Sequence, residues 1–204
     1  MTLTIWFSLL LISMLGAMSP GPSLATVAKH TLSGRRINGI AAAWAHSIGI
    51  GIYAFITVIG LAVVLQQSPV VFKAISYLGA TYLAYLGYGA LRSTGGIAAK
   101  LESGEQVTLL ESAKEGLLIS LLNPKIALFF LALFSQFVAA GNTPIDKAII
   151  VITPIIIDGL WYTLISCLLS APKIVDKLRS KAQWIDRLSG VVLILLALRV
   201  VFYA

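Results

Sequence analysis

Met18-Ser19-Pro20-Gly21-Pro22 interrupts an apolar, membrane-length segment near the start of the chain, and Asn123-Pro124-Lys125 interrupts another in mid-chain. In each motif a good helix-capping residue, Ser19 or Asn123, directly precedes a proline, which suits the first position of a helix. Each motif therefore predicts a helix that ends and begins again within the bilayer. Lipid offers the freed backbone groups no hydrogen-bond partners, so each break must lie against protein or a polar cavity.

The composition indicates a membrane protein. Of 204 residues, 58% are hydrophobic and 11% are charged, and residues Thr2–Ala28 and Ile37–Phe72 contain no Asp, Glu, Lys or Arg. A helix that crosses a bilayer needs ~20 predominantly apolar residues, so each of these stretches is long enough. We predict an all-α membrane protein with six transmembrane helices: Leu3–Val27, Ile40–Leu65, Val70–Leu91, Gly116–Ala140, Ala148–Ser170 and Leu188–Tyr203.

The mixed-charge segment 92–115 is predicted to link two halves, about residues 1–91 and 116–204, of one transmembrane domain. Each half would contain three spans with a proline break in the first. Because three is an odd number, a duplicated half must insert upside down relative to its partner. This is the inverted-repeat plan of many secondary transporters, in which broken helices in corresponding positions mark the binding site.

Basic residues indicate the orientation. Loops one, three and five carry Lys29, Arg35, Arg36, Arg92, Lys100, Lys114, Lys173, Lys177, Arg179, Lys181 and Arg187, whereas loops two and four carry only Lys73 and Lys147. Lys and Arg favour cytoplasmic loops, so both termini are predicted on the outer side. The net charge of +7 is explained by this topology, and no nucleic-acid partner is predicted.

Five motifs occur in order along the chain: Met18–Pro22, Gly34–Gly39, Leu78–Gly87, Leu121–Phe130 and Asp158–Tyr162. Together they resemble the motifs of the LysE/RhtB family of amino-acid exporters. The resemblance implies a multi-pass protein of the bacterial inner membrane that exports amino acids or close derivatives, coupled to the proton gradient. The second span departs from the small residues and glycines usual in the family, because it reads Ala43-Trp44-Ala45-His46-Ser47. This departure leaves the identity of the substrate open.

The two breaks are the first candidate site. They present helix N-termini, whose N–H groups and positive dipole ends favour an anion such as an amino-acid carboxylate. The predicted substrate-binding residues here are Ser19, Pro20, Gly21, Pro22, Asn123, Pro124 and Lys125. The alternative is a pair of proline kinks that serve only packing, which membrane helices tolerate.

Lys125 and Asp158 lie deep within their predicted spans, where a charge costs ~3 kcal/mol without a partner or water. We expect the substrate carboxylate near Lys125, and the substrate ammonium or a proton on Asp158. Trp161, on the same helix face as Asp158, is predicted to contact substrate as well. The alternative is a static Lys125–Asp158 ion pair that only neutralises two charges.

His46 is a second candidate for a proton relay, because histidine readily exchanges a proton near neutral pH. The alternative is a hydrogen-bonded packing residue. An enzyme is not predicted, because the spans contain no paired acids, metal-ligand spacing or activated nucleophile. No metal site or cofactor is expected, since Cys167 is the only cysteine.

Another transport function stays open. An exporter or channel for an inorganic ion could use Asp158 and unwound carbonyls, although hard divalent cations prefer ~6 or more oxygen ligands and Lys125 opposes a cation path. The expected partners are a small amino-acid substrate and membrane lipid. The sequence leaves a homodimer open.

Overall fold

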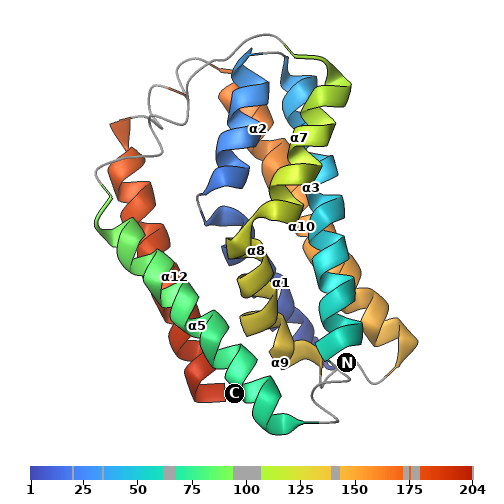
Figure 1. Ribbon diagram of the computed structural model, residues 1–204. Helices are drawn as coiled ribbons and strands as arrows, with labels where there is room; N and C mark the ends of the chain where they lie inside the picture. The colour runs from blue at the N-terminus through green and yellow to red at the C-terminus, as the bar shows by residue number, and fades with distance from the viewer. Residues whose placement is uncertain are drawn as a thin grey trace.

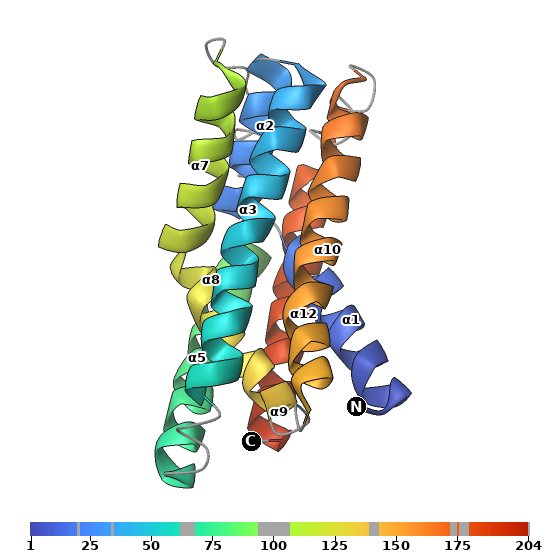
Figure 2. The same cartoon turned by 90° about the vertical axis from the view of Figure 1, so that its right-hand side faces the viewer.

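The computed structural model describes residues 1–19, 21–33, 35–61, 68–93, 107–138, 143–171, 175 and 180–203. Within these ranges all regular secondary structure is helical (Figures 1 and 2). The elements are α1 (Leu3–Met18), α2 (Pro22–Ser33), α3 (Arg36–Ile56), η1 (Thr57–Leu61), α5 (Pro69–Leu91), α7 (Leu109–Leu122), α8 (Pro124–Phe129), η2 (Phe130–Phe134), α9 (Ser135–Val138), α10 (Pro144–Leu169) and α12 (Ala182–Tyr203). The prediction of an all-α protein is confirmed for this part of the chain.

In the part of the chain that the structure describes, two helical segments are long and apolar enough to cross a membrane: Arg36–Gly60 and Pro144–Leu169. Two bent pairs, α1 with α2 and α7 with α8–η2, raise the number to as many as four if each pair is one span. The bends are 62° and 49°. The six predicted spans and their inverted arrangement therefore stay predictions.

The second break forms as predicted. Asn123 ends α7 and caps α8, because its side-chain oxygen accepts a hydrogen bond from the Lys125 backbone N–H at 3.0 Å. Pro124 occupies the first turn of α8, where its missing N–H leaves no helical bond unmade.

The first break differs from its prediction. Ser19 is the C-cap of α1, and its own N–H bonds back to Leu15 and Gly16. The next helix begins at Pro22 rather than Pro20, and the Gly21 carbonyl accepts its first hydrogen bond from Ala25 N. With prolines two apart the sequence offers two starts, and the second one is used. Pro20 lies outside the described residues.

Four of the helices, α3, α7, α10 and α12, begin four or more residues earlier than predicted. In α7 and α10 the reason is a capping box formed by a Thr and an acidic residue. Thr108 and Glu111 cap α7, so this helix starts at Leu109, inside the segment predicted as a linker. Thr143 and Asp146 cap α10 at Pro144, ahead of the predicted Ala148. In such a box a Thr side chain and an acidic side chain three residues later each bind the other's backbone N–H. Because the first turn is then polar, a prediction from hydropathy starts the helix too late.

The helices form two groups. The antiparallel α5 and α12 lie side by side and lean away from the group formed by α1, α2, α3, α7 and α10 (Figure 1). Glycines on both helices allow this close packing. A Cβ added to Gly87 would lie only 2.8 Å from the Gly190 carbonyl oxygen, and one added to Gly190 would lie only 2.6 Å from the Gly87 carbonyl oxygen. Within the other group, α3 packs against both α7 and α10.

The restarted helix α8 and the π-turn η2 lie at the centre of the apolar core. Phe129, Phe130 and Phe134 are buried there, with ring centroids of Phe130 and Phe134 4.2 Å apart. The cluster includes residues from α1, α3, α5, α10 and α12. At the second break itself, Asn123 is buried, whereas its neighbours Leu122 and Pro124 are exposed.

The chain begins and ends at the same end of the bundle (Figure 2).

Candidate substrate-binding site

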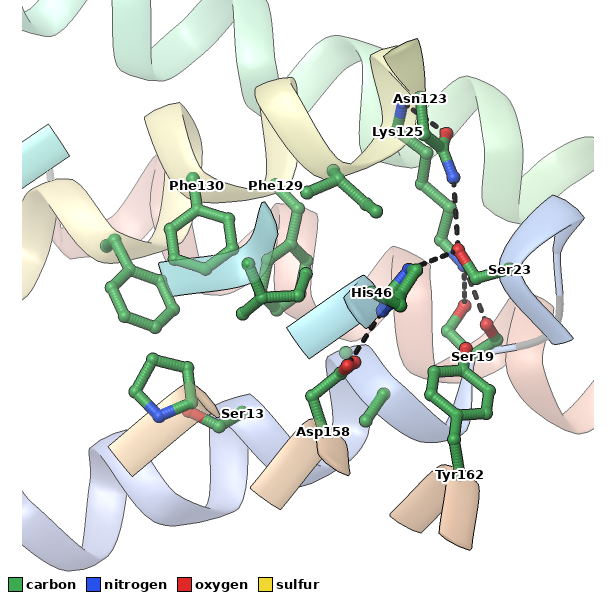
Figure 3. Close-up of a pocket in the computed structure, with 16 residues that line it drawn as sticks. Ser13, Ser19, Ser23, His46, Asn123, Lys125, Phe129, Phe130, Asp158 and Tyr162 are labelled. Carbon is green, nitrogen blue, oxygen red and sulfur yellow. Dashed lines mark hydrogen bonds and ion pairs between the residues drawn. The ribbon is translucent and has the colours of Figure 1, made fainter. Parts of the chain in front are cut away.

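A polar pocket lies where the two broken helices meet α3 and α10 (Figure 3). Its volume is about 40 Å³. Its polar lining consists of Ser13, Ser19, Ser23, His46, Asn123, Lys125, Asp158 and Tyr162, and its apolar lining includes the three phenylalanines of α8 and η2. Four helical elements that are distant in sequence thus bring their deeply placed polar groups to one point.

Asp158 is held by His46. Asp158 Oδ2 lies 2.7 Å from His46 Nδ1, and His46 Nε2 lies 2.8 Å from Ser23 Oγ. Asp158 is 5% exposed and His46 is 1% exposed. The imidazole of His46, on α3, thus connects the Asp158 carboxylate on α10 with the Ser23 hydroxyl in the first turn of α2 (Figure 3).

Lys125 reaches across the other side of the pocket to the first break. Its Nζ donates hydrogen bonds to both the carbonyl oxygen and the hydroxyl of Ser19, each at 2.8 Å. Ser19 stands at the C-terminal end of α1, where the helix dipole favours a cation. Gly21 lies beside the lysine, since a Cβ added there would be in ordinary van der Waals contact with Nζ at 3.4 Å. A positive group therefore ties the two breaks together.

The structure brings together most of the predicted residues but not all. Ser19, His46, Asn123, Lys125 and Asp158 line the one pocket. Gly21, Pro22 and Pro124 shape the two breaks without being part of the lining. Trp161 lines a different, apolar cavity.

The static Lys125–Asp158 ion pair is not the arrangement found. Asp158 pairs with His46, whereas Lys125 binds Ser19. Both residues nonetheless border the same pocket. A chain of hydrogen bonds runs from Asp158 through His46, Ser23 and Asn123 to the backbone N–H of Lys125.

Sequence reasoning missed Ser23 as a site residue. Its hydroxyl faces His46 and also accepts a 3.4 Å hydrogen bond from Asn123 Nδ2, so it connects the two breaks. A hydroxyl in the first turn after a proline break was the available signal. Tyr162 follows Asp158 by four residues in α10, and its ring meets the His46 ring edge-on with centroids 5.3 Å apart.

A second ionic cluster lies outside the pocket, between α2 and α7. Glu115 accepts from Lys29 Nζ at 2.9 Å and contacts His30 Nε2 at 3.0 Å, and His30 Nδ1 meets the Ser112 hydroxyl at 3.1 Å. In the described residues no group of three or more His, Cys, Asp or Glu could hold a metal ion.

Comparison with known proteins identifies the family. A family model described as "LysE type translocator" matches residues 14–204. The chain belongs to this family. Membership, together with the apolar helices, makes this LysE-type chain a multi-pass membrane transporter and not an enzyme.

Curated relatives of this LysE-type chain are bacterial. It is 29% identical to an uncharacterized membrane protein of Haemophilus influenzae over 91% of its own length and 90% of the relative's. It is 27% identical to the threonine efflux protein of Escherichia coli K12, over 92% and 93% of the two chains. It is 34% identical to the leucine efflux protein of Salmonella choleraesuis, over 66% and 64%. None of the solved structures matches significantly.

Proposed function

We propose that this LysE-type translocator exports amino acids across the bacterial inner membrane in exchange for protons. Relatives named for threonine and for leucine efflux support amino acids as the substrate class. The observation that carries the coupling is the buried Asp158–His46 pair beside the two helix breaks.

The single negative charge of Asp158 neutralises only one of two competing cations. A protonated His46 and the ammonium of an amino acid are both suitable partners for the carboxylate. When the ammonium takes the place of the imidazole on Asp158, His46 no longer has a counter-charge and releases its proton to the cytoplasm. Return of the proton from the other side of the membrane restores the pair and expels the ammonium, so one solute leaves for each proton that enters.

The carboxylate of the substrate is expected at Lys125. The ammonium of Lys125 lies at the first break, and its own helix begins at the second, so both the lysine charge and the positive end of the helix dipole favour an anion there. The present hydrogen bonds of Lys125 to Ser19 and of His46 to Asp158 must be exchanged for those of the substrate. We infer that the 40 Å³ pocket expands as this exchange occurs.

The inverted-repeat plan with six crossings is also part of the proposal. Supporting it, each of the three elements of the first half has a counterpart that packs or bends alike: α1–α2 with α7–α8, α3 with α10, and α5 with α12. The basic residues near the α2–α3 turn and the start of α7 lie at the end of the bundle opposite to the termini (Figure 1). By the rule for Lys and Arg, the termini then face out.

An inorganic ion is not favoured as the substrate. A fixed lysine ammonium already binds the Ser19 carbonyl, which is the kind of oxygen that a metal cation would need.

The test is accumulation of amino acid by purified protein in lipid vesicles with an acidic lumen. For the native protein, we expect concentrative uptake that stops when the pH gradient is removed. Asp158→Asn should abolish accumulation, and His46→Gln should retain exchange of labelled for unlabelled amino acid while losing the response to the gradient. His30→Gln is the matched control, because His30 is equally buried and also faces a carboxylate, but outside the pocket. Full gradient-driven accumulation by Asp158→Asn would refute the coupling role.

A further inference from the structure

A second cavity lies beside the polar pocket, between α1–α2, α10 and α12. Its volume is about 350 Å³, against about 40 Å³ for the polar pocket. Leu15, Leu24, Trp161, Ile165, Leu188 and Val192 form much of its wall. Ser19 lines both spaces, so the two meet at the first helix break.

The sizes of the two spaces suggest different tasks. A buried water needs ~10–15 Å³ of such volume, so the polar pocket has room for only a few waters. Small-molecule sites usually measure ~300–1,000 Å³, and the second cavity falls in that range. The polar pocket can therefore hold the charged groups of a small solute, while the bulk of that solute needs the adjoining cavity.

The chemistry of the cavity wall restricts what can enter. None of the described lining residues is charged, and the polar ones are Ser19, Ser189 and the indole of Trp161. A basic or acidic side chain would lose its water there without a countercharge, at a cost of several kcal/mol. An apolar side chain would lose nothing and would gain contact area with leucine, isoleucine and tryptophan.

We propose that this cavity receives the side chain of the substrate, and that the exported amino acids are those with large apolar side chains. This inference rests on the proposed function. Trp161 follows Asp158 by less than one helical turn in α10, so an ammonium on Asp158 places the substrate side chain within reach of the indole. The carboxylate then lies at the Ser19 junction, where Lys125 Nζ is 2.8 Å from the serine.

A lipid acyl chain is the competing occupant, since the wall would suit it equally. The junction at Ser19 favours the substrate, because an acyl chain gains nothing from a backbone carbonyl and a lysine ammonium at the end of its cavity. The experiment distinguishes the two.

The experiment measures counterflow of leucine, threonine, lysine and glutamate with the purified protein in vesicles. The kcat/KM for leucine is expected to be at least about tenfold above that for each of the other three amino acids. A factor of this size is what one or two apolar groups of a substrate contribute when they fit a hydrophobic pocket. Val192→Phe, which fills the cavity, should reduce leucine transport about tenfold or more and spare alanine. Val191→Phe is the matched control on the next residue of α12, which is 44% exposed and absent from the cavity wall.

If Val192→Phe does not fold, Leu24→Ala enlarges the same cavity and should shift preference from leucine toward phenylalanine. Equal or better transport of threonine or lysine by the native protein would overturn the inference while leaving amino-acid export intact. Failure to carry any amino acid would instead overturn the proposed function. Retained leucine preference in Val192→Phe, with loss of a co-purifying phospholipid by mass spectrometry, would assign the cavity to lipid.

Discussion

Replacing Gly116 with alanine tests whether α7 and α3 lie in close contact. A methyl group at Gly116 would lie against the Ala42 carbonyl oxygen and 2.8 Å from the Ala42 Cα, in the backbone of α3. Carbon atoms normally pack ~3.5–4.0 Å apart, so the two helices must separate by about 1 Å. Backbone cannot rotate out of the way as a flexible side chain can. We therefore expect a cost near the upper end of the ~1–3 kcal/mol typical of overpacking.

Gly89→Ala is the matched control. Gly89 is an exposed helical glycine in α5 with nothing within 4 Å of an added Cβ. Both substitutions gain the same helix propensity, ~0.5–1 kcal/mol, so the difference between the two variants isolates the overlap. Unfolding by SDS in mixed micelles should show Gly116→Ala less stable than Gly89→Ala by about 2–3 kcal/mol. Equal stabilities would refute the close approach of α7 and α3.

Two smaller predictions concern the ends of helices. Asn123→Ala removes the cap of α8, so the free energy of unfolding should fall by about 1 kcal/mol. Export should fall as well, because Lys125 lies in the first turn of that helix. Unchanged export with the expected loss of stability would contradict a role for the break. Glu115→Gln breaks the ion pair with Lys29, whose side chains are 43% (Lys29) and 44% (Glu115) exposed, so the free energy of unfolding should change by less than ~1 kcal/mol. Transport by this variant should keep its pH dependence. A lost pH response in that variant would move the proton site away from Asp158.

The sequence predicted the structure best where a residue type is compatible with only one local arrangement. Asn123 before Pro124 predicts a capped restart, and the helix begins there. A charge such as Lys125 or Asp158 in an apolar segment must find a partner, and both border one pocket. Nothing in the local sequence identifies the partner, however, because His46 and Asp158 are separated by 112 positions.

Side-chain direction limited the prediction for Trp161. It shares a helix face with Asp158 by spacing, but that face is wide enough to border two spaces, and packing of α1 and α12 divides them. Ser23 was missed for a related reason, since a serine is compatible with helix, cap or pocket until its neighbours are known. The predicted starts of α7 and α10 were also too late, because hydropathy does not detect a polar first turn. Thr108 and Thr143 cap these two helices ahead of the apolar segments.

The crossing of Gly87 and Gly190 has a consequence for specificity. One side of α12 contributes Leu188 and Val192 to the apolar cavity, while Gly190 between them lies against α5. No described residue of α5 borders the cavity, yet any larger residue at position 87 must push α12 toward it. A substitution in α5 is therefore expected to change which substrate the cavity accepts, although α5 does not border the cavity.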